Sequence, residues 1–138
     1  MKKFIVLLIS LLTVACSSSD SGNSTPQSAP VVGTWSLIVP SVQCTETFVF
    51  NSNNTFSGTS LDEIFGGTYA FTAQANTSNR HAFSFTVTSD NQQFDCEGDN
   101  ANDIGTVFNL FAEFPSANVM NWYLQSTGGS LEVTLNKN

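Results

Sequence analysis

Positive charge is scarce in this chain of 138 residues, which holds four lysines and arginines against eleven aspartates and glutamates. Lys2 and Lys3 lie at the start, so only Arg80 and Lys137 remain further along. Without the first fifteen residues, two cations face eleven carboxylates and the formal net charge is −9. Nucleic-acid binding needs a basic surface that neutralises phosphates, so we expect no nucleic-acid partner.

Residues suited to catalysis or metal binding are also few. His81 is the only histidine. In the expected strand it falls on the same face as Phe83 and Phe85, which favours a half-buried position at the strand end. The chain has no Gly-x-Ser-x-Gly, phosphate-binding loop or zinc motif. We therefore expect no enzymatic activity, no cofactor and no metal site.

Long apolar runs are limited to one, from Phe4 to Leu12, broken only by Ser10. A helix from Phe4 to Ala15 would reach about 18 Å, which is too short for a hydrocarbon core of roughly 30 Å. A basic start, an apolar middle and small residues at the end are typical of a secretory signal peptide that is removed on export. We assign residues 1–15 to such a peptide.

The segment Leu12-Thr13-Val14-Ala15-Cys16 resembles the lipobox of bacterial lipoproteins. The resemblance implies that Cys16 becomes the N-terminus and carries a diacylglycerol and an acyl chain, which together anchor a protein stably in a membrane. Ser17 resembles the residue at this place in lipoproteins sorted to the outer membrane. We therefore expect the outer membrane or cell surface of a Gram-negative bacterium. The alternative is cleavage at the same bond without lipid, which gives a secreted protein with a free thiol.

Residues 16–30 contain the predicted lipid site and a serine-rich stretch without aromatic or large aliphatic side chains. Such a stretch cannot bury enough surface to offset its chain entropy, so we predict a disordered tether. The remaining residues, 31–138, are enough for one domain and too few for two.

In that domain apolar and polar residues alternate, as they do in half-buried β-strands. Cys44, Glu46, Phe48 and Phe50 share one face, and glycine- or asparagine-rich turns separate the runs. We expect strands near 33–39, 43–51, 55–60, 67–74, 80–89, 92–97, 105–112, 118–126 and 130–136. Only residues 60–65 are a candidate for a helical turn, and a loop fits equally well. Antiparallel strands in this number build an up-and-down barrel or a β-sandwich.

A resemblance in the first expected strand favours the barrel. Gly33-Thr34-Trp35 resembles the Gly-x-Trp opening of lipocalin and calycin barrels. Bacterial lipocalin-like lipoprotein domains are similar to residues 44–51, 54–56, 67–69 and 131–135. The resemblance implies an all-β domain, an antiparallel, eight- to nine-stranded up-and-down barrel. In lipocalins an arginine from a late strand covers the tryptophan, and here Lys137 is the only basic residue that late.

Cys44 and Cys96 are predicted to form a disulfide. In an exported chain two cysteines outside the lipid site are expected to oxidise. Both also fall on the phenylalanine-bearing face of their segments. Closure of the loop between them should stabilise the fold by about 4 kcal/mol in the chain-entropy model.

Aromatic residues are abundant, with twelve phenylalanines, two tyrosines and two tryptophans. An eight-stranded barrel is just wide enough to be filled by such side chains or to hold one small apolar ligand. The candidate ligand-binding residues are Trp35, Phe48, Phe50, Tyr69, Phe71, Phe83 and Phe85. Trp35 would lie at the closed end of the pocket. The alternatives are a filled interior, or an exposed Trp122 or Tyr123 on which a sugar stacks.

An oxygen-rich stretch from Asp95 to Asp103 suggests calcium, but Ala101 stands where an EF-hand-like loop needs a ligand, so we predict a solvated acidic loop. Two functions then remain. The first is a membrane-anchored envelope lipoprotein whose barrel binds a small hydrophobic ligand. The second is a non-enzymatic structural or interaction module with a filled core. The membrane is the expected partner through the lipid, and the sequence identifies no protein partner.

Overall fold

The computed structural model describes residues 28–138, which form eight β-strands and no helix. The predicted signal peptide, the predicted lipid site Cys16 and the tether as far as residue 27 lie outside the described residues. Within the described part of the chain, no helix is long and apolar enough to cross a membrane.

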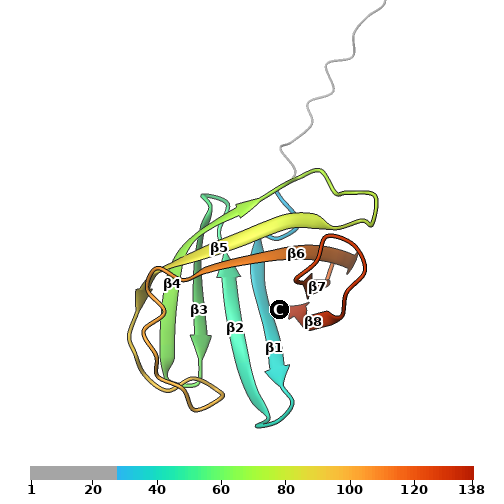
Figure 1. Cartoon of the computed structure of the whole chain (residues 1–138). Coiled ribbons are helices and arrows are strands. Elements are labelled where there is room, and N and C mark those ends of the chain that lie inside the picture. Colours follow the sequence, from blue (N-terminus) through green and yellow to red (C-terminus); the bar gives the residue numbers. More distant parts are fainter. Residues whose placement is uncertain (1–27) are drawn as a thin grey trace, which may run out of the picture.

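The strands follow one another around a closed antiparallel barrel (Figure 1). Their bounds are β1 (Gly33–Val39), β2 (Cys44–Phe50), β3 (Thr55–Ser60), β4 (Glu63–Phe71), β5 (His81–Asp90), β6 (Val107–Ser116), β7 (Val119–Tyr123) and β8 (Leu131–Lys137). Each strand pairs with the next, and β1 also pairs with β8. This confirms the predicted up-and-down barrel, in which no strand edge is left open.

The secondary structure differs from the expected strands at residues 92–97, and it decides between the alternatives left open for residues 60–65. Residues 92–97 are not a strand but part of a long loop between β5 and β6, where Gln92 has a positive φ of 56° that interrupts an extended chain. Residues 60–65 do not form a helical turn. Ser60 pairs with Glu63 across a tight turn at Leu61 and Asp62, and β4 begins at Glu63 instead of residue 67.

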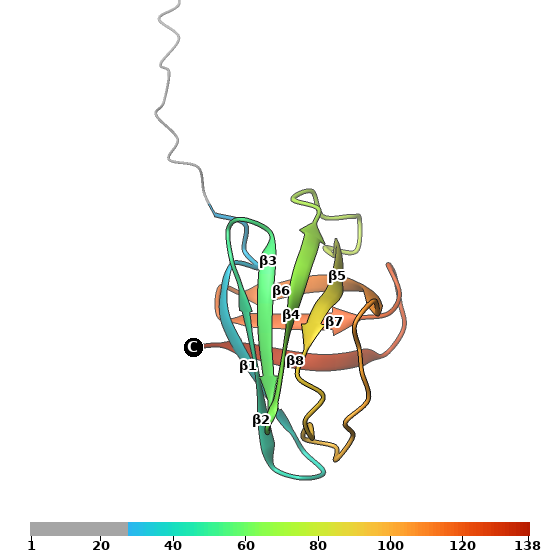
Figure 2. The ribbon, with the colours of Figure 1, turned by 90° about the vertical axis from the view of Figure 1, so that its left-hand side faces the viewer.

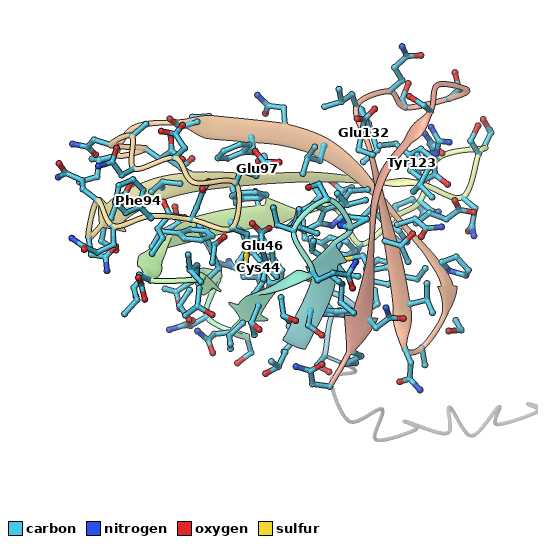
Figure 3. The ribbon with its side chains drawn as sticks, turned by 90° about the horizontal axis from the view of Figure 1, so that it is seen from below. Cys44, Glu46, Phe94, Glu97, Tyr123 and Glu132 are labelled. Atoms are coloured by element: carbon cyan, nitrogen blue, oxygen red, sulfur yellow. A yellow bond between two sulfur atoms is a disulfide. The ribbon has the colours of Figure 1, made fainter. Side chains whose placement is uncertain are left out.

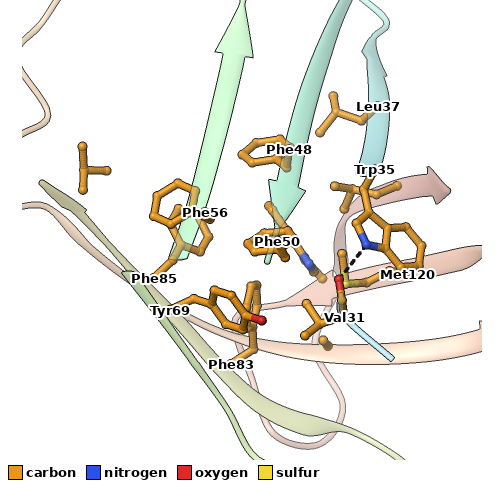
Figure 4. Packing of buried hydrophobic residues seen from close by; sticks show 14 residues of the cluster. Val31, Trp35, Leu37, Phe48, Phe50, Phe56, Tyr69, Phe83, Phe85 and Met120 are labelled. Carbon is orange, nitrogen blue, oxygen red and sulfur yellow. Dashed lines mark hydrogen bonds between the residues drawn. The ribbon is translucent and has the colours of Figure 1, made fainter. Parts of the chain in front are cut away.

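The alternation of the sequence directs the large aromatic side chains into the barrel, where they fill its middle. Phe50 is 1% exposed, and its ring meets the rings of Tyr69 and Phe83 edge-on, each at 5.3 Å between centroids. Figure 4 shows these rings close together in the interior. Edge-to-face contacts of this kind are favourable beyond the area they bury.

Trp35 closes one end of the barrel. Its side chain is fully buried, and its Nε1–H donates a 2.8 Å hydrogen bond to the carbonyl oxygen of Val31 (Figure 4). The Lys137 ammonium, from the last strand, lies 5.1 Å from the centre of the Trp35 ring system, within the range of a cation–π contact. Gly33 has a φ of 138°, a backbone conformation that residues with a side chain rarely adopt, which favours glycine at this position.

A β-bulge at Gly66 and Gly67 bends the sheet where β4 pairs with β5. A side chain at Gly67 would collide with the backbone carbonyl of Thr86, so the two strands approach closely here. Strands β6–β8 cross the direction of β1–β3 steeply, as the two views at right angles show (Figures 1 and 2).

Candidate functional site

A cavity of about 360 Å³ opens at the end of the barrel opposite Trp35, between the β3–β4 turn and the loop of residues 91–106. We call it the mouth cavity. It is lined by Glu46, Phe48, Ser60, Glu63, Phe65, Phe85, Val87, Asp95, Asp103, Phe108, Leu110, Trp122, Leu124, Glu132 and Val133. Its wall thus combines aromatic and aliphatic side chains with carboxylates, and none of the described residues that line it is basic.

The inner wall of the mouth cavity is aromatic. Trp122 packs against Phe48 at 5.3 Å and against Phe85 at 5.7 Å between ring centroids, and Phe108 stacks on Phe85 at 4.6 Å. Phe108 nevertheless remains 37% exposed, because part of its ring faces the opening. The Trp122 Nε1–H is buried without an acceptor among the described residues, so Trp122 contributes to this wall through ring packing.

Three carboxylates from separate segments meet at the rim of the mouth cavity. Glu63 begins β4, Asp90 ends β5 and Asp103 lies in the following loop. Their carboxylate oxygens lie within 4.8 Å of one another. The backbone N–H of Asp103 donates a 2.8 Å hydrogen bond to Asp90 Oδ2, which holds the loop against the strand end.

Glu63 is the most buried of these acids, with 9% of its surface exposed. Burial, and after it the nearby charges of Asp90, Asp95, Asp103 and Glu46, together raise the pKa of its carboxyl group from 4.5 to about 7. No group that would stabilise the charged form acts on it from the described part of the chain. Ionisation of Glu63 is therefore energetically unfavourable in the folded protein.

Glu46 is held on the other side of the rim by a short hydrogen-bond relay. The Ser60 hydroxyl donates to Glu46 Oε1 at 2.7 Å and accepts a 2.9 Å bond from the Cys96 backbone N–H. Burial raises the pKa of Glu46, and the Ser60 bond lowers it in part. The Cys44–Cys96 disulfide, which confirms the predicted pairing, fixes the loop here. Figure 3 looks onto this end, with Glu46 beside Cys44.

Of the seven aromatic residues predicted to bind a ligand, some line the mouth cavity and others lie in the packed interior. Phe48 and Phe85 line the mouth cavity. The buried residues Trp35, Phe50, Tyr69 and Phe83 belong to the packed interior and do not line it. Phe71 is half-buried and stacks on His81 at 4.9 Å, and the His81 Nδ1 lies 2.9 Å from the Thr72 carbonyl oxygen. The barrel is therefore filled through its middle and hollow at one end.

Neither aromatic side chain considered as a sugar platform is free to serve as one. Trp122 is 6% exposed and points into the barrel. The Tyr123 ring is covered by the Arg80 guanidinium, whose central carbon lies 3.4 Å from the ring centroid. Arg80 also donates to the carbonyl oxygens of Gln125 and Gly128, each at 2.7 Å, so it fastens the β7–β8 loop.

Side-chain oxygens of the acidic loop accept hydrogen bonds from the backbone of the same loop. Asp95 Oδ1 accepts hydrogen bonds from the N–H groups of Glu97 and Asp99, at 2.9 and 2.7 Å. Asp99 Oδ1 in turn accepts from Asn100 and Ala101. These side chains stabilise turns within the loop.

Sequence reasoning missed the rim carboxylates Glu63 and Asp90 and the wall residues Phe65 and Phe108, and it assigned Asp103 to a solvated acidic loop. A signal for Glu63 was present, because it has the same parity as Phe65, Tyr69 and Phe71 and so faces inward if β4 extends back to it. Comparison of the chain with models of protein families, with curated proteins and with solved structures finds no match. The fold and the mouth cavity are therefore the basis for any functional conclusion.

Proposed function

We propose that this chain is a lipid-anchored protein of the bacterial envelope whose lipocalin-like barrel takes up a small hydrophobic molecule at its open end. The anchor is supported by the lipobox-like segment ending at Cys16. The ligand is supported by the mouth cavity of about 360 Å³. Ligand pockets span roughly 300–1,000 Å³, so this one suits a small compound.

The cavity is the observation that carries this proposal, because the same aromatic rings that fill the middle of the barrel face open space at its mouth. Phe108 and Leu124 line that space while 37% and 61% exposed. Covering apolar surface stabilises a complex by about 25 cal/mol for each Å² removed from water. A compound with an apolar body would gain this energy without rearranging the packed interior.

The uptake of a ligand is tested with Nile red, a neutral apolar dye. The full chain carrying Cys16→Ser avoids competition from lipid and detergent. We expect saturable dye fluorescence that an unlabelled apolar compound displaces. Leu110→Trp, which places a large side chain in the mouth cavity, should abolish it. Val107→Trp, on an exposed position of the same strand, is the matched control and should bind as before. Equal binding by both variants would contradict the proposal.

The lipid anchor has a separate test. The unmodified chain should sediment with membranes and carry a mass increase at Cys16 that corresponds to the attached lipid. Cys16→Ser should appear in the soluble fraction. Membrane association of that variant would show that the attachment does not depend on the predicted lipid.

A further inference from the structure

We propose that the ligand of the mouth cavity is a small organic cation, in which a protonated amine meets Glu63 and an apolar body lies against the aromatic wall. The inference rests on the proposed function, because it names the chemical class that the same cavity accepts. It is carried by the burial of Glu63, by the sign of every charged group around it and by the chemistry of the surface beneath it.

Glu63 is a largely buried acid with no partner among the residues that the structure describes. It is 91% covered, it lines the mouth cavity, and no hydrogen bond or ion pair to its carboxylate is found among residues 28–138. A carboxylate that is largely removed from water is destabilised unless it is paired or hydrogen-bonded. An ammonium group offers three donors and the opposite charge, and it would satisfy this carboxylate from the cavity side.

Every charged group of residues 28–138 that acts on Glu63 is negative. Asp90 and Asp103 lie beside it, and Glu46 and Asp95 add to the negative field from the other side of the rim. The two basic side chains of the described barrel are engaged elsewhere, Arg80 at Tyr123 and Lys137 at Trp35. Such a field attracts a cation and repels an anionic head group, so a fatty acid carboxylate is disfavoured.

The rim is better suited to an ammonium than to a metal ion. Both oxygens of Asp90 already accept backbone hydrogen bonds, from Gln92 at 2.6 Å and from Asp103 at 2.8 Å. Glu63 and Asp103 are left to act as ligands, whereas calcium takes about 6–8 oxygens.

The surface below the rim is aromatic, and a hydrated metal ion would leave it uncovered. Phe65 lies two residues along β4 from Glu63, and Phe48, Phe85 and Trp122 form the deeper wall. Aromatic faces attract cations and also accept an apolar chain or ring. One amphiphilic amine would thus satisfy the rim and fill the cavity at the same time.

The test compares three compounds that share one skeleton and differ in charge: phenylbutylamine, phenylbutanol and phenylbutyrate. Each is titrated by calorimetry into the full chain carrying Cys16→Ser at about pH 8, where Glu63 is mostly ionised. We expect the amine to bind roughly tenfold more tightly than the alcohol, and the carboxylate to bind most weakly. If the alcohol binds as tightly as the amine, the cavity takes apolar compounds without regard to charge and this inference is overturned.

Single variants identify the residues responsible for the preference for the amine over the alcohol. Glu63→Gln should weaken the amine roughly tenfold and leave the alcohol within about twofold, which also shows that the cavity is intact. Glu97→Gln removes one exposed charge from the same loop without altering the cavity lining, and it should change neither affinity. Asp103→Asn is the second rim variant and should weaken the amine alone.

The remaining outcomes separate the two proposals. An unchanged amine affinity in both rim variants would overturn the assignment to Glu63 while leaving a ligand-binding barrel. Saturable binding of calcium alone, lost in Glu63→Gln and unaccompanied by amine binding, would overturn it in favour of a metal site. Failure of all three compounds to bind would contradict the proposed function and this inference together.

Discussion

Replacement of Glu63 by glutamine should change how the stability of the barrel depends on pH. In the folded chain, burial and the neighbouring acids Asp90, Asp95, Asp103 and Glu46 raise the pKa of Glu63 to about 7, whereas its ordinary value is 4.5. The folded state therefore holds more protons than the unfolded state between these two values. Linkage then requires the free energy of unfolding to fall as the pH rises through this window.

The size of the effect follows from the two pKa values. The difference between 4.5 and about 7 corresponds to roughly 3 kcal/mol, which is fully present as stability below pH 4.5 and is lost by about pH 7. Glu63→Gln has no proton to lose at this position. Its unfolding free energy should therefore decline less over the same window, and the two proteins should differ most above pH 7.

The assay is urea unfolding between about pH 4 and pH 8, at equilibrium and with the disulfide intact. The buried residues Trp35 and Trp122 are the only two tryptophans and report on the barrel by fluorescence. Glu97→Gln removes an exposed charge and should follow the pH dependence of the parent chain. Parallel curves for the parent and Glu63→Gln would refute the reasoning, because they would mean that Glu63 titrates alike in the folded and unfolded chain.

Further predictions concern the fold. Replacing both Cys44 and Cys96 with alanine should lower the unfolding free energy by about 4 kcal/mol, because the bridge closes a loop across 52 residues of sequence; urea unfolding of the parent and the double variant checks this. Gly67→Ala should cost more than about 2 kcal/mol, since its Cβ would collide with the carbonyl of Thr86, and an unchanged melting temperature would contradict the close strand approach. Trp35→Phe should cost about 2 kcal/mol in the same unfolding assay, because it loses a buried hydrogen bond and leaves space at the closed end.

The barrel could be predicted from the sequence because its determinants are local and periodic. Alternation placed Phe48 and Phe50 on one face, and both are buried. The turn residues separated the runs, and the expected ranges for β1 and β3 coincide with the observed strands. The disulfide was predicted because the chain is expected to be exported and because both cysteines fall on the phenylalanine-bearing face, and it is present. Each of these features depends on neighbours in sequence or on a pattern of period two.

The rim of the cavity could not be predicted in this way, because it depends on how a non-periodic loop folds back. Asn91 accepts a 2.9 Å bond from the Ile64 N–H and donates a 3.0 Å bond to the Asp62 carbonyl oxygen. The N–H groups of Asp62 and Glu63 both donate to the Phe94 carbonyl oxygen. These contacts join segments about thirty positions apart, and the bond from the Asp103 N–H to Asp90 holds the far part of the same loop near Glu63. No repeat in the sequence signals either.

The two ends of the barrel differ in a way that links stability to function. At the closed end the Trp35 N–H donates to the Val31 carbonyl oxygen, and the Lys137 ammonium lies over the indole. At the open end Glu63 is buried among like charges and the aromatic wall is left partly uncovered. Such an arrangement costs stability and persists only because the packed interior and the disulfide hold it. A bound ammonium would remove that cost, so saturating phenylbutylamine should stabilise the parent chain more than Glu63→Gln.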